Sequence, residues 1–305
     1  MLEDSGELRG FINEIYPSFE ISDIAKKSGQ RVVYFGRFVS CTEVEPDGCE
    51  LWGDVVLKIS EANSRAAISY IQKEVEILKD IENPKYPKLY FSELLSSDPI
   101  TEETLDIIRF VSFEEKLLAT PLTSIMDDFD TEVKVVDFLI QIVRAMDLLW
   151  NHPQKLVHRD LKPDNILIKD NGEVNIIDLG ILREEGSAGV TNSFNSMGPC
   201  TPLYASPEQA KNDKRNITFK SDVFSIGVIA YEMLSGANPF IDDSGSNYVD
   251  EILERVCSLK PKSLSEFGVS VELSMIVEKM ISKEPYKRYR ASRKLLEELS
   301  GLNVG

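Results

Sequence analysis

The stretch "VHRDLKPDN", residues 157–165, decides how this chain is interpreted. It places a histidine, an arginine, a lysine, two aspartates and an asparagine directly before the apolar stretch "ILI". Such a polar run is either a surface loop without a role or an assembled active site. Its residue types favour the second interpretation, because phosphoryl transfer needs an oriented hydroxyl group, a cation beside the phosphates and ligands for a metal ion.

Individual side chains of this run match those needs. Asp160 can accept the proton of a hydroxyl group, and Lys162 can neutralise charge on a transferred group. Asn165 can ligate magnesium through its amide oxygen. Further along the chain, "DLG" begins with Asp178 at the end of the strand-like "VNIID". Since a hard cation binds oxygen ligands, Asp178 is predicted to be the second magnesium ligand.

Composition restricts the class of protein. The chain has 305 residues, enough for one large domain or two lobes, and a formal net charge of -17. This acidic balance argues against nucleic acid or an anionic membrane as the main partner, because phosphate contacts need clustered Lys and Arg. It would suit basic peptide partners. No apolar run is long enough to span a bilayer and "MLEDSGELRG" lacks a signal-peptide pattern, so a cytoplasmic location is expected.

The cysteines do not indicate a disulfide framework. There are four of them, and they are too few and too scattered for one. They form no CxxC pair, so no zinc site is expected. Free thiols in a reducing cytosol are the simplest interpretation of Cys41, Cys49, Cys200 and Cys257.

Alternating apolar and polar residues predict strands in the first third of the chain. Strands are expected at residues 19–26 and 31–45. The "PDG" turn at 46–48 and a return strand at 49–60 then predict a long hairpin.

Helical periodicity dominates the remainder. A helix is predicted within residues 61–84, where Asn-Pro ends the apolar pattern. Buried helices are predicted at residues 132–151, capped by Asp130 or Thr131, and at residues 220–236. The change from strand-like to helical periodicity predicts two lobes joined near residues 119–124.

Several short motifs together resemble protein kinases of the eukaryotic-like Ser/Thr type, and the resemblance spans nearly the whole chain. The catalytic loop of that family resembles "HRDLKPDN", and "DLG" stands where the family usually has DFG. A single short motif can occur by chance, but the ordered and correctly spaced set is typical of the family. The other motifs are "VVLK" at 55–58, "KEVEIL" at 73–78, "TPLYASPE" at 201–208, "SDVFSIG" at 221–227 and "KEPYKRYRA" at 283–291.

The resemblance implies an α+β, bilobal protein-kinase-like fold with a small strand-rich N-lobe and a larger helical C-lobe. A lead-in at residues 1–18, the N-lobe at 19–121 and the C-lobe at 122–305 would together form one kinase domain.

The resemblance also implies roles for the residues of the helical lobe. Asp160 would be the catalytic base, and Lys162 would contact the transferring phosphoryl group. Asn165 and Asp178 would hold magnesium. Lys162 together with Thr201 is the pattern of kinases that phosphorylate serine and threonine.

Other matching residues would hold ATP or support the loop. Lys58 would bind the α and β phosphates and be held by Glu74. Asp222 would brace the catalytic loop, and Arg288 would pair with Glu208.

The family's phosphate-covering loop, GxGxxGxV, has no counterpart in this chain, and two registers compete for its place. In the first, "KKSGQRVVY" at 26–34 covers the phosphates, with Gly29 at the turn and Val33 packing on adenine. In the second, "YFGRFVSC" at 34–41 does so around Gly36. The first is preferred, because it leaves a proper strand ahead of the loop and puts small and polar residues at the turn.

The leading hypothesis is an ATP-dependent and magnesium-dependent Ser/Thr protein kinase with protein substrates, for which basic segments would suit the acidic chain. Alternatives are a pseudokinase that acts as a binding or scaffolding module, and a small-molecule phosphotransferase. The pseudokinase alternative is motivated by the lack of glycines in the phosphate-covering loop. A small-molecule phosphotransferase would not be expected to carry "TPLYASPE" and Arg288. No feature indicates an oligomeric state.

The segment from Asp178 to Glu208 is the expected activation segment. It contains "GVTNSFNSMGPC", which offers the hydroxyl groups of Thr191, Ser193 and Ser196. In the family, an arginine at the position of Arg159 often pairs with a phosphate on this segment.

Overall fold

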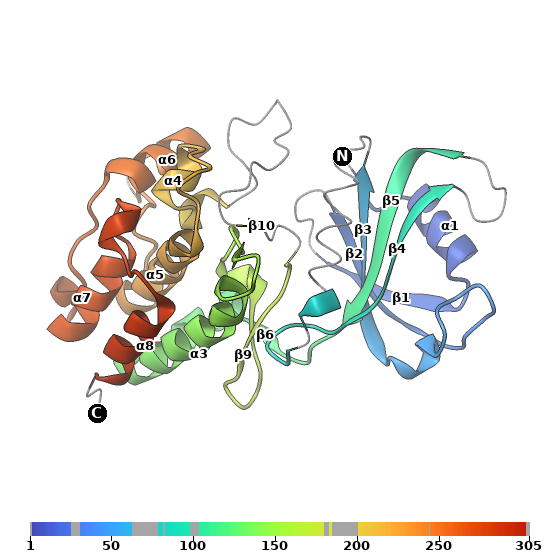
Figure 1. Ribbon diagram of the computed structural model, residues 1–305, viewed down its shortest axis with the longest axis horizontal. Helices are drawn as coiled ribbons and strands as arrows, with labels where there is room; N and C mark the ends of the chain where they lie inside the picture. Colours follow the sequence, from blue (N-terminus) through green and yellow to red (C-terminus); the bar gives the residue numbers. More distant parts are fainter. Residues whose placement is uncertain are drawn as a thin grey trace. The chain divides into compact units, whose positions relative to one another are not determined.

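The computed structural model describes residues 2–25, 31–62, 79–81, 83–97, 104–179, 183–184, 201–243 and 245–302. The chain divides into two compact units, Met1–Leu118 and Ala119–Gly305. The first contains an antiparallel sheet and the second contains the long helices (Figure 1), as expected for a kinase-like α+β fold. The helix predicted within residues 61–84 lies, apart from its ends, outside the described residues.

The first unit is built on a five-stranded antiparallel sheet with the strand order β1-β2-β3-β5-β4. Side chains alternate between its two faces, and one face enters the core. Leu57 and Ile59 of the third strand, and Val111 and Phe113 of the fifth, are fully buried there. The strands are β1 (Phe19–Ile24), β2 (Arg31–Phe38), β3 (Asp54–Ala62), β4 (Leu89–Ser97) and β5 (Thr104–Glu115).

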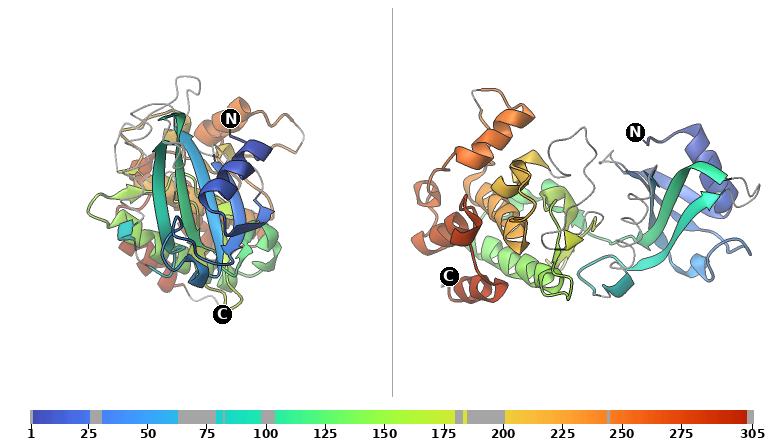
Figure 2. Two further views of the ribbon diagram at one scale, coloured as in Figure 1. Left: turned by 90° about the vertical axis from the view of Figure 1, so that its right-hand side faces the viewer. Right: turned by 45° about the horizontal axis from the view of Figure 1, so that its top comes forward.

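A helix formed by the N-terminal lead-in covers one face of this sheet. Ser5 caps α1 (Gly6–Ile15) by accepting a hydrogen bond from the N–H of Leu8 at 3.1 Å. The helix contributes Leu8, Phe11, Ile12 and Ile15 to the same core as the strands. This spacing of i, i+3, i+4 and i+7 is the helical signature. Figure 2 shows the helix lying against the sheet. The lead-in is therefore a structural part of the first unit.

The long hairpin predicted across residues 31–60 was wrong in its middle part. β2 ends at Phe38, well before residue 45, and the return strand β3 starts at Asp54. Between them the chain forms a loop and the 3-10 turn η1 (Cys49–Leu51).

The carboxylate of Glu45 explains why the strand stops. This buried group accepts hydrogen bonds from the backbone N–H of Ser18 at 2.7 Å and of Thr42 at 2.9 Å. It also accepts from both hydroxyl groups of the same residues. The polar residues that alternate in the sequence thus close a turn instead of pairing with a strand.

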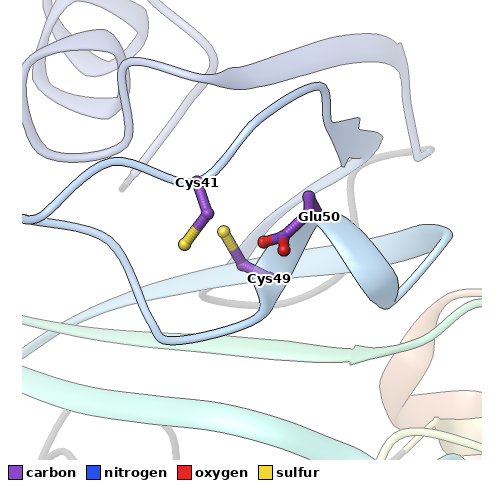
Figure 3. Close-up of side chains that lie close together, drawn as sticks. All are labelled: Cys41, Cys49 and Glu50. Carbon is purple, nitrogen blue, oxygen red and sulfur yellow. The ribbon is translucent and has the colours of Figure 1, made fainter.

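The same loop brings two cysteines together. The sulfur atoms of Cys41 and Cys49 and a carboxylate oxygen of Glu50 all lie within 4.8 Å of one another (Figure 3). Gly48 makes this possible, because its φ of 72° lets the chain turn back just before Cys49. The cysteines that the structure describes, Cys41, Cys49 and Cys257, are free thiols, as expected.

The second unit is mainly helical, and two of its helices match their predictions. α3 (Glu132–Trp150) and α5 (Phe219–Ser235) occupy the expected positions. Thr131 caps α3, and Gly236 ends α5 in the left-handed conformation with φ of 77°. The other helices are α4 (Pro207–Ala210), α6 (Val249–Ser258), α7 (Val271–Met280) and α8 (Ser292–Ser300). Among the described helices of the chain, none has the length and apolar character needed to cross a bilayer.

Short strands hold the segment between α3 and α4. One sheet contains β6 (Thr120–Pro121), β8 (Ile166–Ile168) and β9 (Val174–Ile176), and a second pairs β7 (Leu156–Val157) with β10 (Arg183–Glu184). The 3-10 turns are η2 (Leu122–Ser124), η3 (Met126–Asp128), η4 (Pro163–Asn165), η5 (Pro202–Tyr204), η6 (Leu264–Phe267) and η7 (Pro285–Lys287). Residues 158–165 therefore run from one sheet to the other, which fixes both ends of the polar stretch.

Gly36 offers a test of the packing of β1 on β2. A Cβ atom on Gly36 would overlap the carbonyl oxygen of Glu20 and lie 2.6 Å from Cζ of Phe19. We expect Gly36→Ala to lower the free energy of unfolding by about 1–3 kcal/mol, as overpacking does. Gly10→Ala is the control, because a Cβ on this residue of α1 meets no atom within 4 Å. Alanine should stabilise the helix there by about 1 kcal/mol. Thermal unfolding of both variants measures the effects, and equal stability would contradict the packing described.

Candidate active site

The carboxylate of Asp222, in the first turn of α5, holds the start of the polar loop. It accepts hydrogen bonds from the backbone N–H groups of His158 and Arg159, both at 2.9 Å, and from the indole N–H of Trp150 at 2.9 Å. Burial raises the pKa of the Asp222 carboxyl, whereas these three bonds favour its ionised form. The expected bracing role of Asp222 is confirmed by this geometry.

The loop bends at Arg159, whose φ of 71° lies in the left-handed region. A residue with a Cβ adopts this conformation only when its surroundings impose it. Asp222 holds the N–H of Arg159, and the side-chain amide of Gln209 donates to its carbonyl oxygen at 2.7 Å. Both sides of the bend are therefore fixed from outside the loop.

Asp160 follows the bend, and polar groups surround its carboxylate. Oδ1 accepts hydrogen bonds from the backbone N–H and the hydroxyl group of Thr201, both at 2.8 Å. Oδ2 lies 3.2 Å from Nζ of Lys162, which in turn donates to the Thr201 hydroxyl at 3.1 Å. The carboxylate of Asp160, the ammonium group of Lys162 and the hydroxyl group of Thr201 thus contact one another.

The two predicted magnesium ligands belong to paired segments of the chain. The backbone N–H of Ile177, the residue before Asp178, donates to the carbonyl oxygen of Asn165 at 3.0 Å. The side-chain amide nitrogen of Asn165 donates to the carbonyl oxygen of Asp160 at 2.8 Å. The amide oxygen of the Asn165 side chain takes no part in that bond. A carboxylate and an amide oxygen suit a hard cation such as Mg²⁺, so this donor set fits the ion.

The backbone of Asp178 has an uncommon conformation. Its φ is 60°, in the left-handed region that residues with a Cβ rarely adopt.

The remaining predicted site residues belong to the first unit. Lys58 lies in β3, opposite Val33 of β2. Its Nζ atom lies 2.7 Å from Oε2 of Glu114 in β5. The expected partner Glu74, and Gly29 of the preferred loop register, lie outside the described residues.

A buried ion pair fixes the end of the segment that follows Thr201. The Arg288 guanidinium contacts the Glu208 carboxylate through two parallel bonds, Nη1 to Oε1 at 2.7 Å and Nη2 to Oε2 at 3.0 Å. Its other donors reach the carbonyl oxygens of Ser282 at 2.8 Å, Lys220 at 2.9 Å and Lys283 at 3.2 Å. The expected pairing of Arg288 with Glu208 is confirmed.

A family model described as "Protein kinase domain" matches residues 53–298. The chain belongs to the protein kinase family.

Curated relatives agree with this assignment. The chain is 28% identical to the probable serine/threonine-protein kinase PknB of Bifidobacterium longum, over 82% of this chain and 36% of that protein. It is 35% identical to the serine/threonine-protein kinase PknB of Mycobacterium leprae, over 52% of this chain and 25% of that protein. A probable serine/threonine-protein kinase of Clostridium perfringens is 26% identical, over 80% of this chain and 33% of that protein. The chain thus matches about a third or less of the length of these relatives.

Three residues that contact predicted functional residues within their own units were missed by the sequence analysis. They are Glu114 beside Lys58, Gln209 beside the bend of the catalytic loop, and Ser221, whose hydroxyl donates to Glu208 at 2.6 Å. The signal for Glu114 was a carboxylate within the apolar run "IIRFVSFEE". Its partner depends on how β5 pairs with β3, which the sequence does not show.

The Glu208–Arg288 pair predicts a large difference between two arginines of the C-lobe. The side chains of Arg288 and Glu208 are 0% and 3% exposed. Arg288→Ala should lower the free energy of unfolding by about 3–5 kcal/mol, because it leaves a buried carboxylate without a counter-ion. Arg293→Ala removes an exposed ion pair with Glu297 and should change stability little. Urea unfolding of both variants measures the two effects, and a small loss for Arg288→Ala would show that the buried pair is not needed.

Proposed function

We propose that this chain is an ATP-dependent serine/threonine protein kinase, which transfers the γ-phosphoryl group of ATP to a hydroxyl group of a protein. The arrangement around Asp160 carries the proposal. Its carboxylate already accepts a hydrogen bond from a threonine hydroxyl, that of Thr201, at 2.8 Å. It also lies 3.2 Å from the ammonium group of Lys162. A carboxylate that binds a hydroxyl group beside a cation is what phosphorylation of a hydroxyl group requires.

In the proposed reaction, the substrate hydroxyl donates its hydrogen bond to Asp160. This bond orients the oxygen for attack on the γ-phosphorus, and Asp160 takes the proton as the new P–O bond forms and the bond to ADP breaks. Lys162 offsets the negative charge on the group in transfer. Thr201 holds both side chains in place, through its hydrogen bonds to each of them.

Asn165 and Asp178 would hold Mg²⁺, and Lys58 would hold the phosphates of ATP. When bound, magnesium neutralises charge on the phosphates and keeps them in line with the incoming oxygen. Val33 of β2 and Gly29, four residues earlier in the sequence, would contribute to the nucleotide site, and Glu74 would support Lys58.

The proposed substrates are proteins with serine or threonine acceptors, in line with the names of the relatives. The formal net charge of -17 favours basic segments near the acceptor, because opposite charges speed encounter. A cytoplasmic location is part of the proposal, since the described cysteines are free thiols.

Replacing the proposed base tests the reaction. Asp160→Asn should lower phosphoryl transfer by about 100-fold or more, because the amide accepts no proton. Asp164→Asn, a change of the same kind at an exposed residue of η4, should leave transfer close to normal. Purified proteins with labelled ATP, magnesium and a basic protein substrate provide the measurement. Normal labelling by Asp160→Asn would contradict the role of Asp160, and no labelling by any form would favour a binding module without transfer.

Arg159 suggests that phosphorylation activates the enzyme. Burial lowers the pKa of Arg159 to about 10, so the side chain remains a cation at neutral pH. Its buried Nε and Nη2 atoms have no hydrogen-bond partner within the described residues. A phosphate on Thr191, Ser193 or Ser196, which lie outside the described residues, would supply an acceptor with the opposite charge.

Phosphopeptide mapping of active protein, before and after phosphatase treatment, tests this regulation. We expect phosphate on at least one of the three hydroxyl groups, and a loss of activity of about tenfold or more on its removal. Arg159→Ala should make activity insensitive to the phosphatase. Active protein without phosphate in this segment would rule out the mechanism.

A further inference from the structure

The ion pair between Lys58 and Glu114 joins two neighbouring strands of the first unit. Val56 of β3 lies opposite Glu114 of β5. Lys58, two residues further along β3, lies opposite Ser112. The two charged residues are therefore diagonal neighbours on one face of the sheet, a distance that long side chains can span. Nζ of Lys58 lies 2.7 Å from Oε2 of Glu114, and each side chain is 12% exposed.

Burial gives this pair its importance. An ammonium group removed from water needs an anion nearby, because otherwise its desolvation cost is not offset. Glu114 meets that need within the described residues. The hydroxyl group of Ser112 lies 3.5 Å from the second carboxylate oxygen, Oε1, which leaves Oε2 for Lys58.

The phosphates of ATP would be a second anion for the same ammonium group. A molecule in which Glu114 holds Lys58 binds phosphate less readily. The apparent affinity for ATP is therefore the intrinsic affinity multiplied by the fraction of molecules in which Lys58 is available.

We propose that Glu114 is a positioning residue that holds Lys58 in the nucleotide-free kinase and competes with the phosphates of ATP for it. The inference rests on the proposed function, because it takes Lys58 to be the ATP-binding lysine. The carboxylate keeps the lysine folded onto its own sheet before ATP arrives, and it weakens ATP binding as a consequence. Glu114 thus raises the concentration of ATP at which the enzyme is half-saturated.

Glu114→Gln isolates the effect of charge, because glutamine has nearly the size and shape of glutamate. This variant should bind MgATP about threefold to tenfold more tightly than the unmodified chain. Glu115→Gln is the matched control, since Glu115 is the next residue of β5 and its side chain accepts a hydrogen bond from the backbone N–H of Lys88. Calorimetric titration with MgATP gives the dissociation constants. Equal affinities for the two variants, or weaker binding by Glu114→Gln, would overturn the proposal.

A double-mutant cycle shows whether Glu114 acts through Lys58. In the Lys58→Met background there is no ammonium group to compete for, so Glu114→Gln should change the affinity by less than about twofold. A gain as large as in the unmodified background would mean that Glu114 acts on the nucleotide by some other route, and the positioning role would be wrong.

Acylation of lysine side chains, without nucleotide, tests the ion pair separately from ATP binding. Lys58 held by a carboxylate should react slowly with an acetylating reagent, and Glu114→Gln should speed its reaction about threefold or more, measured by mass spectrometry. Glu115→Gln should not change this rate. An unchanged acetylation rate in Glu114→Gln would show that the ion pair does not protect Lys58, and it would overturn the proposal. Failure of the unmodified chain to bind MgATP would instead overturn the proposed function.

Discussion

The buried carboxylate of Asp222 fixes the backbone on which the active site is built. It accepts two consecutive N–H groups of the catalytic loop and so imposes the left-handed turn at Arg159. That turn presents the next residue, Asp160, to Thr201 and Lys162. The proposed reacting groups thus depend on a residue in the first turn of a helix that begins much later in the chain. A rigid helix, rather than the loop itself, determines where the proposed base lies.

Buried cations of this kinase differ in how their charge is satisfied, and the difference follows their roles. Arg288 has a bidentate carboxylate and three carbonyl acceptors, so it is fully engaged and serves the structure. Lys58 contacts one carboxylate among the described residues, and an ammonium group has three donors. Arg159 has buried nitrogen atoms without a partner in the described part of the chain. In the function proposed above, Arg288 would be a brace, Lys58 a ligand site and Arg159 a site for a regulatory phosphate.

The sequence predicted those parts of the fold whose causes are local. The helices α3 and α5 carry continuous apolar patterns with a cap or a terminal glycine, and the catalytic loop combines several residue types at fixed spacing. The end of β2 was not predictable, because it depends on hydrogen bonds between Glu45 and the distant Ser18. The contact between Lys58 and Glu114 was not predicted for the same reason. Strand register determines which residues pair across a sheet, and it depends on the whole fold.

The helix α1 and the first two strands lie before residue 53, where the match to the kinase family model begins. A chain shortened to that match would expose the backbone hydrogen-bonding groups along one side of β3, which β2 now covers. It would also uncover Leu57 and Ile59, which are buried in the core shared with α1. An open strand edge beside an apolar face is a template on which further copies can add. The N-terminal segment therefore keeps β3 inside the sheet, in addition to completing the core of the first unit.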